Sequence, residues 1–108
     1  MLAFSGPIVN DTIGLGGHLS LELRTDRGPG AVGAWFHASA GLIGTGPLSG
    51  EISRDGQVRL NGRLMMGANP FDCALRARLI GDRLVGEATF VRATNGASAH
   101  SRFTLYRS

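Results

Sequence analysis

The fold is decided by the stretch QVRLNGRLMMGANPFDCALRARLIGDRLVGEATF, residues 57–90. Apolar and polar side chains alternate along it, so that Val58 and Leu60 lie on one side of the chain and Gln57 and Arg59 on the other. A period of two residues is typical of a β-strand with one buried face. The stretch therefore predicts three consecutive strands, and the glycines and the proline that interrupt the alternation mark the turns.

The turn residues also predict how neighbouring strands are aligned. We expect a three-residue loop at 54–56, a four-residue loop at 67–70 and two-residue turns at 81–82 and 95–96. These turns align the strands in the following pairs: Glu51 with Arg59, Leu60 with Ala77, Arg76 with Glu87, and Ala88 with Phe103. All four alignments keep the apolar residues on one face, whereas an error of one residue would move the apolar set of a whole strand to the other face.

The first half of the chain continues the pattern less regularly. Residues 18–24 alternate leucines with polar residues, and residues 31–38 form an apolar strand after a turn at 25–30. Short strands are also expected in three further segments: residues 3–9, 12–15 and 39–43. Seven or eight strands with short connections predict an all-β, antiparallel up-and-down meander that closes into a small barrel.

Composition fits this fold. The 108 residues suit a single barrel domain over 1–108, and 17 glycines are too many for a helical protein. The outward rows are polar and ionic, the reverse of a membrane-spanning barrel, so we expect a soluble protein with no membrane span. No signal-peptide pattern begins the chain, and the single cysteine, Cys73, favours a reducing, cytoplasmic compartment.

The charge of the chain gives only a weak indication of function. All eleven basic residues are arginine, and the formal net charge is +3, but no basic run is present. Among the aromatic residues, only Tyr106 and Trp35 are candidates for exposed base-stacking contacts, so nucleic-acid binding is a minor alternative. We interpret the arginines of the outer rows as a solvated, paired sheet face rather than a binding patch.

The inward rows mix large apolar residues with glycine, alanine and serine. In one interpretation the side chains interlock and the glycines let the strands coil; in the other, the small residues line a cavity. An eight-stranded barrel is just wide enough to be filled by side chains or to hold one small ligand. We favour the filled interior and keep the cavity as an alternative.

Two inward positions break the apolar rule: Arg107 at one end of the barrel, beyond Leu105, and a second arginine at the opposite end, which bears Met66 and Phe71. There Arg92 follows Phe90 on the inner face of its strand. Rim arginines commonly extend to water, but a guanidinium beside aromatic and thioether side chains can also hold the carboxylate of an amphiphilic ligand. The predicted ligand-binding residues are therefore Arg92, Met66 and Phe71.

Two further candidates depend on the orientation of one strand. Trp35 and His37 share one face of the strand at 31–38, and Val32 and Phe36 share the other. The preceding turn leaves the register ambiguous by one residue, and we expect the uniformly apolar set to face inward. If Trp35 and His37 face inward instead, they become additional ligand contacts.

No catalytic or metal-binding motif stands out. The three histidines, His18, His37 and His100, are not at metal-ligand spacing. Cys73 lies in an inward row, and no histidine or aspartate neighbours it in the paired strands, which predicts an inert thiol. We therefore predict no catalytic residue, no metal and no cofactor.

The meander of glycine-punctuated strands resembles the calycin barrels, the lipocalin and avidin-like group. The resemblance is carried by Gly33-Ala34-Trp35, which matches the Gly-x-Trp motif on the first strand of those proteins. Here the motif falls at residue 33, too late for a standard barrel to follow it, and the lipocalin disulfides have no counterpart. The resemblance implies an internal ligand site and identifies no ligand.

Three functional hypotheses remain. The first is a non-enzymatic barrel module that binds an apolar or amphiphilic small molecule or serves as an interaction domain. The second is a barrel-type cyclase or isomerase, in which an apolar cavity and one arginine or histidine act on the substrate. The third is an arginine-rich barrel that binds nucleic acid.

Overall fold

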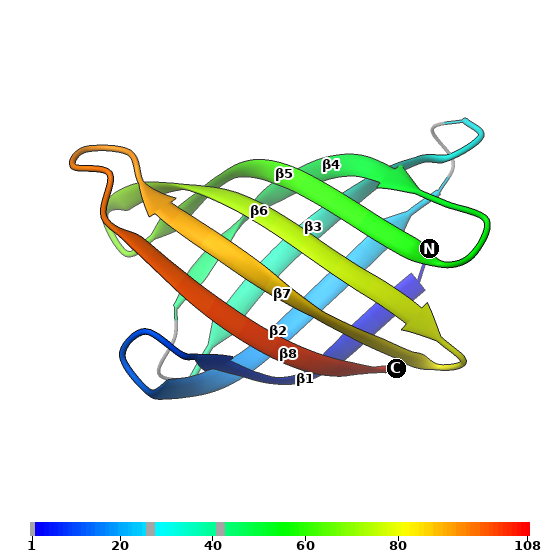
Figure 1. Cartoon of the computed structure of the whole chain (residues 1–108), viewed down its shortest axis with the longest axis horizontal. Helices are drawn as coiled ribbons and strands as arrows, with labels where there is room; N and C mark the ends of the chain where they lie inside the picture. Colours follow the sequence, from blue (N-terminus) through cyan, green and yellow to red (C-terminus); the bar gives the residue numbers. More distant parts are fainter. Residues whose placement is uncertain (1, 26–27, 41–42) are drawn as a thin grey trace.

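The computed structural model describes residues 2–25, 28–40 and 43–108, and the structural statements below concern these residues. The strands are β1 (Leu2–Asn10), β2 (Leu15–Arg24), β3 (Ala31–Ser39), β4 (Gly44–Ile52), β5 (Gln57–Met66), β6 (Asn69–Ile80), β7 (Arg83–Arg92) and β8 (Ser98–Arg107). Each strand pairs antiparallel with the next, and β8 returns to β1, so that the sheet closes into a barrel (Figure 1). The described residues contain no helix. The predicted all-β meander is confirmed, with eight strands.

The barrel is flattened, with principal extents of 36 × 23 × 18 Å. Its strands run obliquely to the long axis, with β6, β7 and β8 in front of β2 and β3 in Figure 1. The seam between β1 and β8 closes it, and there Phe4 faces Arg107 while Asn10 faces Ser101. Because every strand has a neighbour on both sides, none of the eight presents a free edge.

Two of the predicted alignments are confirmed. Glu51 faces Arg59 across β4 and β5, and Arg76 faces Glu87 across β6 and β7. The turn that joins each pair of strands contains a glycine with positive φ, as expected for short hairpin connections.

The alignment across β5 and β6 was predicted wrongly by two residues. Leu60 faces Leu75, where Ala77 was expected. The expected four-residue loop is a two-residue turn, because Gly67 adopts a left-handed conformation (φ 66°) and β6 already begins at the second residue after it. A glycine at the first central position is the signature of this tight hairpin turn.

The alignment across β7 and β8 was also wrong by two residues. Ala88 faces Ser101, where Phe103 was expected. The connecting loop is longer than predicted: the amide of Gly96 donates to the carbonyl oxygen of Arg92 at 2.8 Å, which places four residues, 93–96, in the turn. Because both errors are even numbers, the inner and outer faces are as predicted, but the neighbours within each face differ.

The first half of the barrel departs from expectation at two segments. Of residues 12–15, expected as a strand, residues 12–14 lie in the turn between β1 and β2, and Leu15 is the first residue of β2. The side-chain oxygen of Asn10 accepts hydrogen bonds there from the amides of Thr12 (2.9 Å) and Ile13 (3.3 Å), an arrangement typical of asparagine in turns. The separate strand expected at 39–43 is wrong for its described residues: Ser39 ends β3, Ala40 lies in a turn, and Ile43 precedes β4. Residues 41–42 of that segment and residues 26–27 of the expected turn lie outside the described residues.

Side chains fill the interior. Twenty apolar residues are at most 8% exposed. The rings of Phe36 on β3 and Phe90 on β7 meet edge to face, with their centroids 5.9 Å apart. Since β3 and β7 are not neighbours in the sheet, this contact crosses the interior, as expected of a filled barrel.

Neighbouring backbones approach closely at inward-facing glycines. A Cβ on Gly86 would overlap the carbonyl oxygen of Arg76, and a Cβ on Gly50 would overlap a carbonyl oxygen of β5. The same relation holds at two further glycines, Gly6 and Gly62. The neighbouring strand thus occupies the volume of a missing side chain, which lets the sheet bend sharply enough to close.

Replacement of Gly86 tests this close approach. We expect Gly86→Ala to destabilise the barrel by at least about 2 kcal/mol, because its methyl group overlaps backbone that cannot shift without disturbing the β6–β7 ladder. Gly16→Ala is the control, since its Cβ would meet one atom at 3.9 Å. We expect this change to be neutral or stabilising by up to about 1 kcal/mol. Urea unfolding measures both, and equal stabilities would contradict the close approach.

A second set of variants tests the assignment of the two faces. Phe103 and Leu75 are 3% and 1% exposed, and truncation of either to alanine should cost about 2–5 kcal/mol. Arg59→Ala, on the exposed face, should cost less than about 1 kcal/mol. Similar losses of stability in a denaturant titration would show that the faces are exchanged.

Candidate functional site

Three of the five predicted site residues come together at one end of the barrel. Phe71 faces Arg92 across β6 and β7, and Met66 lies at the adjoining end of β5. All three are partly buried, and both Met66 and Phe71 pack against the core. Whether these residues bind a ligand stays a prediction.

Arg92 has a protein partner that the sequence did not reveal. Its Nη2 donates a hydrogen bond to Oδ1 of Asn69 at 2.7 Å. Asn69 was expected in a loop, but it is the first residue of β6 and faces Met66. The Arg92 Nε is buried and makes no hydrogen bond to a described residue. The guanidinium is therefore held by the barrel itself, and a ligand at the mouth cannot reach the Nε.

Trp35 and His37 lie elsewhere. Both are exposed on the outer wall of β3, with 48% of Trp35 accessible, whereas Val32 and Phe36 are buried. The expected orientation of this strand is confirmed. Trp35 and His37 therefore do not line the interior with Arg92.

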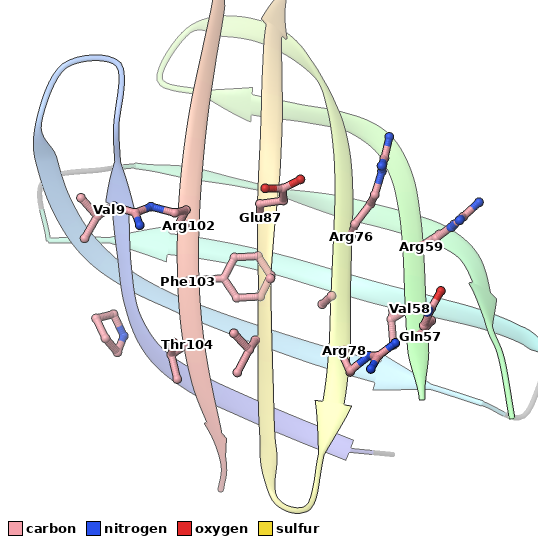
Figure 2. A pocket seen from close by; sticks show the side chains of 14 residues that line it. Val9, Gln57, Val58, Arg59, Arg76, Arg78, Glu87, Arg102, Phe103 and Thr104 are labelled. Atoms are coloured by element: carbon pink, nitrogen blue, oxygen red, sulfur yellow. The ribbon is translucent and has the colours of Figure 1, made fainter. Parts of the chain in front are cut away.

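A hollow of about 730 Å³ lies on the outer wall, across β1, β8, β7, β6 and β5. Three arginines line its β5–β6 end: Arg59, Arg76 and Arg78. Apolar side chains line the other part: Pro7, Val9 and Val85. Figure 2 shows Val9 and Arg102 on one side of this site and the three arginines on the other, with Glu87 between them. We call it the arginine hollow.

The floor of the arginine hollow coincides with a close approach of two strands. Gly86 and Ala77, which face each other across β7 and β6, both line the hollow. The first has no side chain and the second has one methyl group, and the two backbones are close at this point. The constraint that bends the sheet thus leaves little side-chain volume beneath the outer wall.

The register places like charges side by side at one end of the arginine hollow. Arg59 faces Arg76 directly, and Arg78 lies two residues further along β6. Facing residues have their Cβ atoms about 5 Å apart, and every second residue of a strand recurs after about 7 Å. Like charges in facing positions destabilise a sheet, so this wall carries a repulsion that the fold itself does not require.

In the described part of the chain, no carboxylate lies within ion-pair distance of these three arginines. Glu87 faces Arg76 across the ladder, but its Oε2 lies 3.2 Å from Nε2 of His100. Glu51 faces Arg59 without forming such a pair. The three guanidinium groups are therefore exposed to solvent and open to an external anion.

Asp55 is the acid whose titration responds to Arg78. A hydrogen bond from Ser53 is the main cause that lowers the pKa of the Asp55 carboxyl, and the charge of Arg78 adds a smaller contribution. Asp55 is exposed in the loop between β4 and β5 and is not among the residues that line the hollow. Asp55 therefore lies outside the arginine hollow and does not neutralise the charge of its arginines.

The fourth arginine of the hollow, Arg102, has a partner. Its Nε and Nη2 donate to the two carboxylate oxygens of Asp11 at 2.8 and 3.0 Å. These hydrogen bonds lower the pKa of Asp11, and the neighbouring His100 adds to the effect. Because Asp11 follows β1 and Arg102 lies on β8, this pair fastens the seam of the barrel, and the free positive charge is confined to the β5–β6 end.

The described residues offer no reactive thiol and no cluster of metal ligands. Burial raises the pKa of Cys73 to about 12, so that its thiol stays protonated at neutral pH. Within residues 2–25, 28–40 and 43–108, no three histidine, cysteine or acidic side chains are arranged to hold a metal ion. The same residues include no helix of the length and apolarity needed to cross a membrane.

Comparisons with known protein families, with curated proteins and with solved structures found no match to this chain.

Removal of one facing arginine tests the repulsion. We expect Arg76→Gln to leave the barrel as stable as the wild type or more stable by up to about 1 kcal/mol, because it relieves Arg59 of a facing like charge. The difference should be larger at about 10 mM salt, where charges act over about 30 Å, than at about 1 M, where they act over about 3 Å.

Arg63→Gln is the control for this measurement. Arg63 pairs with Asp72 at 3.0 Å, so its loss should lower stability slightly at low salt, by less than about 1 kcal/mol. Urea unfolding at both salt concentrations distinguishes the two signs. A destabilised Arg76→Gln protein would show that this guanidinium has a structural partner.

Proposed function

We propose that the chain is a non-enzymatic interaction module that binds an anionic partner on its outer wall, at the arginine hollow. The observation that carries the proposal is the cluster of Arg59, Arg76 and Arg78, exposed and without ion-pair partners among the described residues. Guanidinium groups form paired hydrogen bonds with carboxylates and phosphates, so three adjacent arginines suit an anionic group.

The filled interior favours a binding site on the outer wall over a binding site inside the barrel. A contact between Phe36 and Phe90 spans the barrel, and Arg92 at its mouth is hydrogen-bonded to Asn69. The proposal departs here from the calycin-like resemblance, which implies an internal ligand. The motif that carries this resemblance lies on β3, and its Trp35 is on the outer wall.

The chemistry of the site favours binding over catalysis. A cyclase or isomerase of the kind considered from the sequence acts on a substrate enclosed in an apolar chamber, and side chains occupy that space here. The hollow itself offers guanidinium groups, which stay protonated and cannot exchange protons with a substrate near neutral pH.

Titration with decanoate and with decanol, followed by NMR, tests the location of binding. We expect decanoate to shift the amide resonances of Arg76, Arg78 and Val85 in fast exchange, because its carboxylate meets the arginines. Decanol, which has the same chain without the charge, should not. The core methyl groups of Leu21 and Leu60 should stay unchanged with both.

Arg92→Ala is the matched variant for the alternative site. On the outer-wall proposal, the decanoate response is the same in this variant and in the wild type. Shifts of the core methyl groups that disappear in Arg92→Ala would instead support an amphiphile held at the mouth of the barrel and would overturn the proposal.

A further inference from the structure

The two ends of the arginine hollow differ in chemistry, and this difference restricts which partners can bind there. Resting on the proposed function, we infer that the hollow binds an extended acidic segment of another protein, in which an apolar side chain is followed by carboxylates at the second and fourth residues after it.

Charge and apolar surface are separated along the hollow. Its β1–β8–β7 part presents Pro7, Val9 and Val85, which are exposed, and the positive charge of Arg102 there is matched by Asp11. The β5–β6 part presents the three unpaired arginines. A partner that fits therefore carries an apolar group at one end and negative charge at the other.

The closed barrel excludes recognition by strand addition. All eight strands are paired on both sides, so a peptide cannot extend the sheet through its own backbone hydrogen bonds. Side chains must therefore make the contacts with the peptide, and the arginines make them through guanidinium groups at the ends of long side chains, away from the backbone of the sheet. An extended segment can then lie across the strands, with alternate side chains directed at the wall.

The spacing of the wall matches that of an extended chain. Thr104, Val85 and Arg78 lie in one row across β8, β7 and β6; Gln57 continues this row on β5, and Arg59 lies two residues along β5 from Gln57. With strands about 4.8 Å apart and every second residue about 7 Å further along a strand, a point between Thr104 and Val85 is about 7 Å from the position of Arg78 and about 14 Å from that of Arg59. Alternate side chains of an extended peptide recur at about 7 and 13 Å. One apolar and two acidic side chains therefore reach the three positions together.

The lining residues favour a protein over a single-stranded nucleic acid. Nucleic-acid grooves combine positive charge with exposed aromatic rings on which bases stack. The aromatic residue that lines this hollow, Phe103, is 3% exposed and belongs to the core. Tyr106 and Trp35 are exposed but do not line it.

Short synthetic peptides test the inference. The probe is a seven-residue peptide with blocked ends, with leucine at position two, glutamate at positions four and six, and serine elsewhere. One control replaces both glutamates by glutamine, and a second moves one glutamate to position five. We expect NMR shifts at Arg59, Arg76 and Val85 with the probe, affinity at least about tenfold lower for the glutamine control, and weaker binding for the displaced control.

Variants of the chain separate specific from diffuse charge effects. Arg59→Gln/Arg76→Gln should weaken binding of the probe by at least about tenfold, because two charge-assisted contacts are lost. Arg24→Gln changes the net charge on β2, outside the hollow, and should change the affinity by less than about twofold. Far-UV circular dichroism and urea unfolding confirm that the variants stay folded.

The outcomes distinguish the inference from the function on which it rests. Equal binding of the glutamate and glutamine peptides overturns the inference. So does an equal loss of affinity for the probe in Arg24→Gln and in the double variant, relative to the wild type. A response to decanoate, or to a ten-residue oligothymidylate at the same arginines, without a response to the peptide overturns the inference and leaves the proposed function standing. No response of the hollow to any of these probes overturns both.

Discussion

A closed sheet of only eight strands has to bend sharply, and a bend of this kind brings the backbone of one strand into the space where a neighbour's side chain would stand. Gly86 and Gly50 have no side chain to fill this space, and a carbonyl oxygen of the adjacent strand occupies it. The remaining inward positions can then be large, so that rings from β3 and β7 touch across the interior. Closure and dense packing are consequences of the same constraint.

The bend also shapes the outer surface. Where β6 and β7 approach each other, Gly86 and Ala77 leave little side-chain volume, and the arginines on either side of this point project over a hollow with an apolar part. Two of them, Arg59 and Arg76, face each other at a cost to the sheet. A cost that packing does not explain is typical of a surface selected for binding, because stability and function compete for the same residues.

The sequence predicted the class of fold and the two faces, but not the hollow. Alternation along residues 57–90 determines which side of each strand is buried, and an error of two residues in a turn leaves that result intact. The same error changes which outward residues are neighbours. With the predicted loop at 67–70, Arg59 is opposite Arg78 and Arg76 is opposite Asn61; in the structure Arg59 faces Arg76. The conformation of one glycine, Gly67, therefore decides which of the outward residues face each other, and alternation carries no information about it.

The seam between β1 and β8 has a consequence for the order of folding. Seven of the eight pairings join consecutive strands, whereas the seam joins residues as far apart as Phe4 and Arg107. Closing a loop of that length costs about 3 kcal/mol more than closing a hairpin, so the ends of the sheet meet last. Until then β1 is an edge strand, exposed to pairing with other chains. Pro7 lies in β1 and has no amide hydrogen to offer to such a strand, so the seam includes a residue that limits aggregation before the barrel closes.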